Sequence, residues 1–202
     1  MSDGHTPKIL CIAGSPRRRG NSERLLEACV SGIREAGGEP DVLITAEAGV
    51  LPCRGCNSCA RTGRCVIVSD GMAEVNDRID DAGAIIVSTP VYFATVPAVL
   101  KTVYDRLQPY WTRAHRLGQP RPARRPGALL VVRGGGDPFG FRATADTTRS
   151  VFAVLGIDSL EELCVEGPDA PGDILGYPAE LARAVEIGIE IVAAARLREG
   201  TG

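Results

Sequence analysis

The sequence has few aromatic residues, few histidines and no long apolar run. Aromatic residues make up 4% of its 202 residues, and one of its two histidines, His5, lies in a polar leader over residues 1–7. His115 alone cannot supply a histidine-centred catalytic triad or a multi-histidine metal site. No apolar stretch reaches the roughly 18 residues that a membrane-spanning helix needs, and no signal peptide opens the chain. We therefore expect a cytoplasmic protein without a membrane partner.

The charge and size of the chain exclude further classes. It carries 23 Lys and Arg against 25 Asp and Glu, a net charge of −2, so it lacks the basic surface typical of nucleic-acid-binding proteins. A hydrophobic content of 44% in 202 residues is enough for one buried core. We expect a single domain over residues 1–202, with a cysteine-rich loop at 52–66.

Four of the seven cysteines gather in that loop. Two gaps of two residues and one of five separate them, a compact spacing that lets thiolates converge on one metal centre. The spacing predicts metal or redox chemistry, and a [4Fe-4S] cluster is the hypothesis that it favours. The cluster ligands would be Cys53, Cys56, Cys59 and Cys65.

Other interpretations of the cysteines are weaker. Structural disulfides are disfavoured in a cytosolic chain, where thiols stay reduced. Zinc sites more typically separate two Cys-x-x-Cys pairs by about a dozen residues or more. Reduced or redox-active thiols are a further alternative, although disulfide exchange needs only two cysteines and usually uses a Cys-x-x-Cys that opens a helix.

A polar loop follows the first expected strand. Lys8–Ala13 is a short apolar run, typical of a strand buried on both faces. Residues 14–22 then lead into a helix that ends before Gly37. Free backbone N–H groups at the start of that helix would attract a phosphate, and four side chains could add donors: Ser15, Arg17, Asn21 and Ser22. Alternatively, Asn21 or Ser22 only caps the helix and the arginines are solvated.

Two nucleotide-binding motifs are missing from this loop. No Lys-Ser/Thr ends it as in a P-loop, and it holds no Gly-x-Gly-x-x-Gly dinucleotide fingerprint. A single phosphate without magnesium fits the loop better.

Strands and helices alternate along the rest of the chain. Strands are expected near residues 41–44, 84–88, 127–133 and 159–165, with a last helix from Pro178. Such alternation favours a parallel sheet with helices on both sides. An arginine-rich segment, residues 108–126, is expected to be a solvated loop, with contacts to nicotinamide phosphates as the alternative.

Two further loops follow expected strands at their carboxyl ends, where ligands of open α/β sheets bind. Residues 89–95 either line a flat aromatic ligand with Tyr92 and Phe93 or pack onto the sheet as an ordinary turn. The glycines at 134–136 either let backbone N–H groups approach a ring or form a tight turn. In a sheet of order 2-1-3-4-5, these loops and residues 15–22 meet at one switch point. A flavodoxin-like α/β fold, a three-layer sandwich that binds the single phosphate and flat ring of FMN, fits all three loops.

The combined motifs resemble the NAD(P)H-dependent FMN reductases from residue 8 to about residue 197. The motifs are Gly14-Ser15-Pro16-Arg17 with Asn21-Ser22, the cysteine loop, Thr89-Pro90-Val91-Tyr92-Phe93, Leu100-Lys101 with Asp105-Arg106, and the glycine triplet. The four cysteines point within that family to the iron–sulfur flavoproteins. In one departure, Asp137-Pro138-Phe139-Gly140 follows the triplet where relatives tend to have a polar or glycine-rich stretch.

The resemblance implies a role for each set of residues. Phosphate contacts would come from Ser15, Arg17, Asn21 and Ser22. Ring contacts would come from Pro90, Val91, Tyr92 and Phe93, and backbone contacts from Gly134, Gly135 and Gly136. The cluster would bind Cys53, Cys56, Cys59 and Cys65. Family members are usually homodimers or homotetramers with the flavin near a subunit interface.

One function hypothesis and two alternatives follow. FMN would exchange two electrons with NAD(P)H or a low-potential carrier, and the cluster would pass them singly to or from a small-molecule or protein partner. No side chain is an obvious general acid or base, so we assign no catalytic residue. The alternatives are a cluster-free NAD(P)H:quinone or azo-compound reductase, and a non-catalytic flavin- or metal-binding redox sensor.

Overall fold

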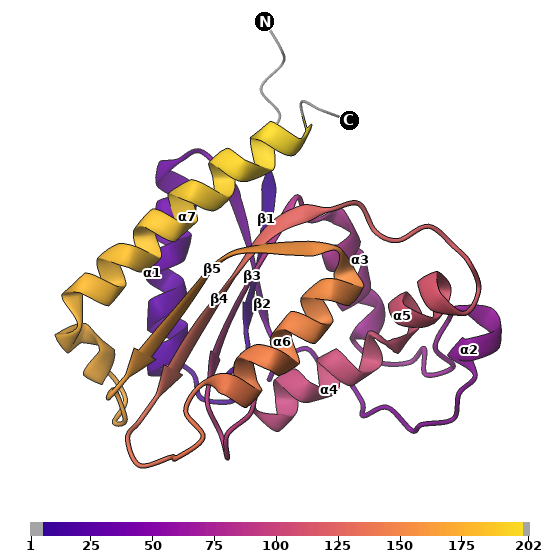
Figure 1. The fold of residues 1–202 in the computed structure, drawn as a ribbon, viewed down its shortest axis with the longest axis horizontal. Helices are drawn as coiled ribbons and strands as arrows, with labels where there is room; N and C mark the ends of the chain where they lie inside the picture. Colours follow the sequence, from indigo (N-terminus) through magenta and orange to yellow (C-terminus); the bar gives the residue numbers. More distant parts are fainter. Residues whose placement is uncertain (1–5, 200–202) are drawn as a thin grey trace, which may run out of the picture.

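A parallel sheet of five strands forms the middle layer of the structure, a computed structural model that describes residues 6–199 (Figure 1). In spatial order, the strands are β2 (Glu39–Ile44), β1 (Lys8–Ala13), β3 (Ala84–Pro90), β4 (Arg125–Arg133) and β5 (Ile157–Glu166). Every neighbouring pair is parallel. The predicted order 2-1-3-4-5 and the flavodoxin-like α/β architecture are confirmed.

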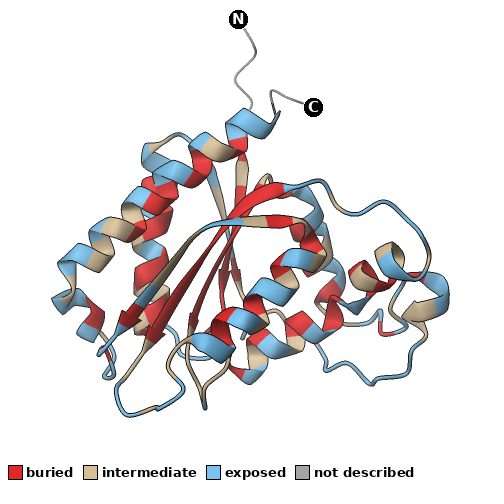
Figure 2. Ribbon diagram, viewed as in Figure 1, coloured by how far each residue is buried: buried red, intermediate tan, exposed pale blue. Residues whose placement is uncertain are grey.

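The side chains of the inner strands alternate between two hydrophobic cores, one on each face of the sheet. In β1, Leu10 and Ile12 belong to one core, whereas Ile9, Cys11 and Ala13 belong to the other. All five are at most 4% exposed. A strand buried on both faces needs an almost unbroken apolar sequence, which is why this strand could be predicted. Figure 2 shows the same burial along β3 and β4.

Two helices cover one face of the sheet: α1 (Asn21–Glu35) and α7 (Pro178–Glu199). They cross where each has a glycine. A Cβ atom on Gly32 would lie 2.0 Å from the Val185 carbonyl oxygen, and one on Gly188 would lie 2.2 Å from the Cys29 carbonyl oxygen. The two helix backbones are therefore in direct contact, which only glycine permits. Even α7, with 22 residues, is not apolar enough to cross a membrane, and the same holds for every other helix within residues 6–199.

The second core lies under four helices: α3 (Met72–Asp81), α4 (Ala98–Arg106), α5 (Gln108–His115) and α6 (Arg142–Leu155). The prediction of a solvated loop over residues 108–126 is wrong in its first part, because residues 108–115 form α5. Pro109 is tolerated there because the first turn of a helix needs no N–H donor from it. Tyr110 and Thr112 are buried, so packing of this helix overrides the charge pattern that suggested a loop.

Candidate functional site

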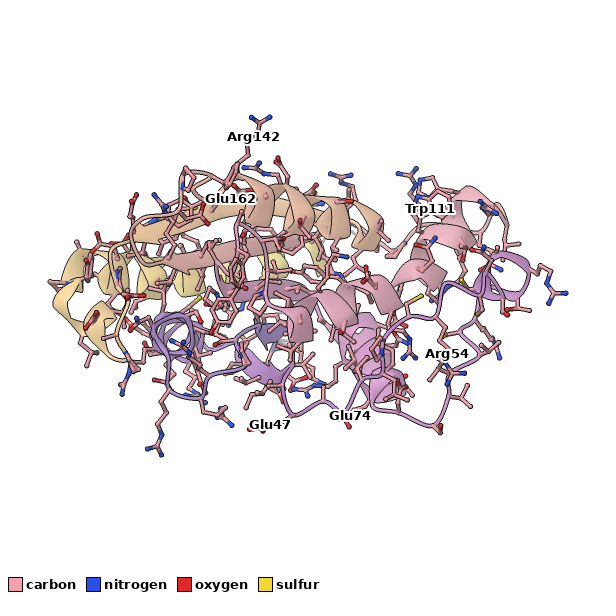
Figure 3. All side chains as sticks on the ribbon, turned by 90° about the horizontal axis from the view of Figure 1, so that it is seen from below. Glu47, Arg54, Glu74, Trp111, Arg142 and Glu162 are labelled. Atoms are coloured by element: carbon pink, nitrogen blue, oxygen red, sulfur yellow. The ribbon has the colours of Figure 1, made fainter. Side chains whose placement is uncertain are left out.

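The three expected ligand loops meet at the carboxyl edge of the sheet, from which Figure 3 is viewed. One cavity is lined by residues of all three loops, and a second cavity shares Val91 and Gly134 with it. Ten of the eleven expected flavin residues line these two cavities: Ser15, Arg17, Asn21, Ser22, Pro90, Val91, Tyr92, Phe93, Gly134 and Gly135. Gly136 lines neither cavity.

The first loop leaves the N-terminus of α1 without a side-chain cap. Gly20 is the N-cap residue, with an extended backbone at φ −72° and ψ 173°, and no described side chain bonds to the first turn as a cap. The helix begins at Asn21, so neither Asn21 nor Ser22 caps it. Ser15 and Ser22 are buried, and the Ser15 hydroxyl accepts a hydrogen bond of 3.0 Å from the Arg17 N–H. N–H groups in the first turn of α1 thus remain available beside the cavity, where they can bind an anion.

The Asn21 side chain holds a fourth loop against the site. Its Oδ1 accepts hydrogen bonds from the N–H groups of Gly172 at 3.0 Å and Ile174 at 3.3 Å, and its Nδ2 donates to the Ala170 carbonyl oxygen at 3.0 Å. This loop contains a short helix, η1 (Asp173–Gly176). The segment before η1 adds three residues to the cavity lining: Pro168, Asp169 and Pro171. We did not predict this role, although the position of the loop after β5 is the signal that identified the other three.

A tight turn after β3 presents Phe93 to solvent. Tyr92 and Thr95 exchange two backbone hydrogen bonds, of 2.8 and 3.1 Å. The two residues between them have positive φ, 49° at Phe93 and 67° at Ala94. The Phe93 ring is fully exposed, whereas Tyr92 lies under the Arg17 guanidinium, which is 5.9 Å from the ring centroid. A strained backbone of this kind is typical of functional sites.

Asp137 links this turn to the loop after β4. Its Oδ2 accepts a hydrogen bond of 3.1 Å from the Ala94 N–H, and its Oδ1 accepts one of 2.8 Å from the Phe139 N–H. Arg133 Nη1 donates to the Asp137 carbonyl oxygen at 2.8 Å. The departure from the family pattern at residues 137–140 therefore supplies the contact that joins two of the expected ligand loops.

The three glycines after β4 differ in whether their positions could accept a side chain. A Cβ atom on Gly134 would lie 2.7 Å from Asp169 Oδ1, so a side chain there would collide with the fourth loop. Gly136 has a φ of 88°, which favours glycine, while a Cβ on Gly135 would have no neighbour within 4 Å. The close packing of the loop after β4 against the loop after β5 thus depends on the absence of a side chain at Gly134.

The cysteine loop lines a separate cavity of about 440 Å³ beside α4 and α5. All four expected ligands line it: Cys53, Cys56, Cys59 and Cys65. Arg54 marks this loop in Figure 3, at the end of the molecule that also carries Trp111. Within residues 6–199, no three His, Cys, Asp or Glu side chains lie close enough together to hold a metal ion. The four cysteines therefore surround one space, but their sulfurs are not in ligand geometry.

Short turns give two of these sulfurs hydrogen-bond partners. The Gly55 N–H donates to Cys53 Sγ at 3.5 Å, and Cys56 Sγ lies 3.5 Å from Ser58 Oγ. Hydrogen bonds from the Ser58 backbone and hydroxyl lower the pKa of Cys56. A short helix, α2 (Cys59–Thr62), follows these turns. Donors directed at sulfur favour the thiolate form that binds metals.

A buried ion pair between Arg106 and Asp70 lies beneath the loop, with side chains 1% and 2% exposed. Burial alone would raise the pKa of Asp70, but hydrogen bonds from Arg106, the Leu51 N–H and the Met72 N–H lower it. Burial would likewise lower the pKa of Arg106, but Asp70 and the neighbouring Cys65 side chain raise it. Both groups therefore stay charged.

The remaining cysteines lie outside both sites. Cys11 and Cys29 are in the core between the sheet, α1 and α7. Burial raises the pKa of Cys29 to about 12. Cys164 is exposed on β5.

Two of the arginines that follow α5, Arg124 and Arg125, lie at the opposite end of β4 from the expected ligand loops. Arg124 pairs with Asp158, and Arg125 donates to the carbonyl oxygens of Ile79 and Ala82. Arg125 opens β4 and the glycine triplet follows it, so the nine residues of that strand separate the two. At about 3.3 Å per residue, this is roughly 30 Å. These two arginines therefore lie far from the cavity at the carboxyl edge of the sheet.

The fold and the loops define a class of protein: a flavodoxin-like sandwich with a cavity between the loops at the carboxyl edge of its sheet. Comparison with known protein families identifies a matching family. The model for NADPH-dependent FMN reductase matches residues 7–166. The chain belongs to the NADPH-dependent FMN reductase family.

Individual relatives agree with this assignment. An iron–sulfur flavoprotein of Methanocaldococcus jannaschii is 38% identical over 102 residues, which are 50% of this chain and 52% of that protein. A second iron–sulfur flavoprotein of the same organism is 30% identical over 149 residues, 73% of this chain and 71% of that protein. The chain spans a little over half the length of several curated relatives that it matches.

A solved structure shares the fold. The NAD(P)H:quinone oxidoreductase from Methanothermobacter marburgensis superimposes with a TM-score of 0.64 at 21% identity, over 92% of this chain and 96% of that one. At this identity the likeness establishes the fold alone.

Proposed function

We propose that the protein is an FMN-dependent oxidoreductase that passes electrons between a reduced donor and an acceptor through FMN and a [4Fe-4S] cluster. The donor would be NAD(P)H or a low-potential carrier. Family membership supports the flavin, and the names of the relatives support the cluster. The observation that carries the proposal is the cavity in which all three loops meet beside the uncapped N-terminus of α1.

In this proposal the first loop binds the phosphate of FMN. The first-turn N–H groups of α1 and the Ser15 and Ser22 hydroxyls would donate hydrogen bonds, and the Arg17 guanidinium would add positive charge. No metal ion is needed because the helix terminus and the arginine supply the positive potential. Asn21 would contribute mainly by holding residues 170–174 in place.

The other two loops would bind the ring system. Pro90, Val91 and Tyr92 line the cavity, and Phe93 lies at its rim. Backbone N–H groups at the glycine triplet can approach a ring that side chains would otherwise block, and such donors stabilise negative charge on a reduced flavin. Bound FMN would supply two-electron chemistry and a cluster one-electron transfer, so no side chain is assigned as acid or base.

The cysteine loop would hold the cluster. Its cavity has the donor set that such a cluster takes, four thiols around one space, with the cationic side chains of Arg54 and Arg106 beside them. Hydrogen bonds from the Gly55 N–H and from Ser58 would support the Cys53 and Cys56 thiolates.

We also propose that the chain forms a homodimer or homotetramer. Phe93 and Phe139 line the second cavity and are 102% and 70% exposed. Exposed aromatic side chains beside a site are typical of interaction surfaces. Light scattering on wild type and Phe93→Ser tests this, and a monomeric wild type would contradict it.

A cluster-free reductase is the second candidate, favoured by the separation of the four sulfurs. Steady-state NADPH oxidation by the FMN-loaded protein, in wild type, Cys59→Ser and the matched control Cys164→Ser, separates the two. The proposal expects Cys59→Ser alone to lose iron and turnover with a one-electron acceptor. Unchanged turnover and an unchanged visible spectrum in Cys59→Ser would support the cluster-free reductase. If neither NADPH nor a low-potential carrier reduces the protein, the redox sensor gains support.

A further inference from the structure

Arg106 contacts both ends of the cysteine loop. Its Nη1 donates to the Leu51 carbonyl oxygen at 2.7 Å, and its Nη2 donates to the Ile67 carbonyl oxygen at 3.0 Å. Leu51 precedes the first cysteine and Ile67 follows the last, so one guanidinium spans the base of the loop. Asp70 compensates its charge and accepts a hydrogen bond of 2.9 Å from the Leu51 N–H.

The same guanidinium lies against the cavity of the four cysteines. Arg106 lines that cavity, is 2% exposed, and its Nε has no hydrogen-bond partner within residues 6–199. Cys65 lines the same cavity as this guanidinium. A buried N–H without a partner is costly, and a thiolate or sulfide in the cavity would satisfy it.

We propose that Arg106 is a positioning residue for the cysteine loop. It fixes both ends of the loop and places a positive charge beside the cavity of the four cysteines, so that a bound cluster has a higher reduction potential than it would without Arg106. The first half concerns the loop alone. The second half rests on the proposed function, because it needs the cluster.

Elementary electrostatics gives the direction of both effects. Loss of two buried hydrogen bonds from a charged donor to the ends of a loop favours opening of that loop by about tenfold or more. Reduction adds a negative charge to a cluster, and a nearby cation or N–H donor stabilises the reduced form. Asp70 offsets part of this charge, but unlike Arg106 it does not line the cysteine cavity, and its carboxylate accepts hydrogen bonds from the Leu51 and Met72 N–H groups.

A double variant, Arg106→Met with Asp70→Asn, removes the pair without leaving a buried charge. Arg106→Lys keeps the charge but cannot span both carbonyl groups. Arg125→Met is the matched control, because Arg125 is also buried and also donates to two carbonyl oxygens but lines no cysteine cavity.

Limited trypsin digestion of the metal-free protein tests the loop, which offers three exposed cleavage sites at Arg54, Arg61 and Arg64. Cleavage elsewhere in the chain reports global unfolding. We expect the double variant to be cut in the loop about tenfold faster than wild type, Arg106→Lys to fall between them, and Arg125→Met to match wild type. Equal loop cleavage in the double variant and in wild type would overturn the first half.

A redox titration of the iron-loaded protein, followed by electron paramagnetic resonance, tests the second half. We expect a more negative cluster potential in the double variant, and potentials near wild type in Arg106→Lys and Arg125→Met. A wild-type potential in the double variant would overturn the electrostatic role. If wild type takes up no iron and sulfide, the proposed cluster and this half both fail, while the digestion result still decides the role of Arg106 in the loop.

Discussion

The Asp137 carboxylate accepts a hydrogen bond of 3.1 Å from the Ala94 N–H, 43 residues earlier in the chain. Ala94 lies in the strained turn after β3, and Asp137 follows the glycine triplet after β4. This contact sets the relative position of the two loops that we assign to the flavin ring.

Replacing Asp137 should weaken FMN binding. Asp137→Ala removes the acceptor for the Ala94 and Phe139 N–H groups, so the strained turn loses its hydrogen bond to the loop after β4. We expect the free energy of FMN binding to weaken by about 1–2 kcal/mol, a roughly tenfold increase in Kd. Quenching of FMN fluorescence measures this Kd. Asp146→Ala, at an exposed carboxylate on α6, is the control and should bind as wild type. Equal affinity in Asp137→Ala and in the control would contradict the assignment of these loops.

Two substitutions of Asn21 separate its positioning role from the phosphate site. Asn21→Ala removes the acceptor of the Gly172 and Ile174 N–H groups, so the loop after β5 should open and FMN affinity should fall. Asn21→Asp keeps the acceptor of the Gly172 and Ile174 N–H groups, although it loses the Nδ2 donor to the Ala170 carbonyl oxygen, and it adds a negative charge beside the expected phosphate. It should therefore hold the loop better than Asn21→Ala does and yet bind FMN more weakly. Hydrogen exchange of residues 170–174 measures the loop, and fluorescence quenching measures FMN. Wild-type affinity in Asn21→Asp would place the phosphate elsewhere.

The crossing of α1 and α7 predicts a large stability difference between two glycine substitutions. Gly188→Ala puts a Cβ atom within 2.2 Å of the Cys29 carbonyl oxygen, so the helices must separate. A destabilisation of about 1–3 kcal/mol is expected from urea unfolding. Gly176→Ala, where a Cβ would have no neighbour within 4 Å, should stay close to wild type. Similar midpoints for the two variants would show that α1 and α7 are not in backbone contact.

The thiols should differ in the pH at which they react. Hydrogen bonds from Ser58 lower the pKa of Cys56, so its thiolate should persist at a lower pH than that of an ordinary cysteine. Burial, with a smaller effect of the Glu162 charge, raises the pKa of Cys164. Rates of alkylation by iodoacetamide in the metal-free protein, resolved by peptide mass spectrometry, should therefore show Cys56 reacting at the lower pH. Ser58→Ala should reduce the difference between the pH values at which Cys56 and Cys164 react. If Cys164 reacted at a lower pH than Cys56, the result would contradict the hydrogen bonds assigned to Cys56.

The fold could be predicted because its signals are local. Lys8–Ala13 and the other inner strands are short apolar runs bounded by polar or glycine-rich loops. A parallel sheet then brings the ends of its strands to one edge, which is why Ser15, Tyr92 and Gly134 line one cavity although they come from three loops.

The features that the sequence did not predict depend on contacts between residues far apart in the chain. Asn21 and Gly172 are 151 residues apart, and nothing in the local sequence of either residue indicates their hydrogen bond. Arg106 belongs to the motif that carries the family resemblance, but its burial under the cysteine loop follows from the packing of α4 against Asp70. The helix at 108–115 could not be predicted from the charge pattern, because burial of Tyr110 against the core stabilises the helix.

The visible absorption spectrum of protein purified without oxygen, before and after dithionite, tests the central claim most directly when FMN, iron and sulfide are assayed on the same sample. The account predicts flavin bands on a broad absorbance that bleaches on reduction, with about one FMN and about four irons per chain. Flavin bands without iron or sulfide would contradict the cluster and leave a two-electron reductase. Absence of flavin from protein supplied with FMN would contradict the account itself.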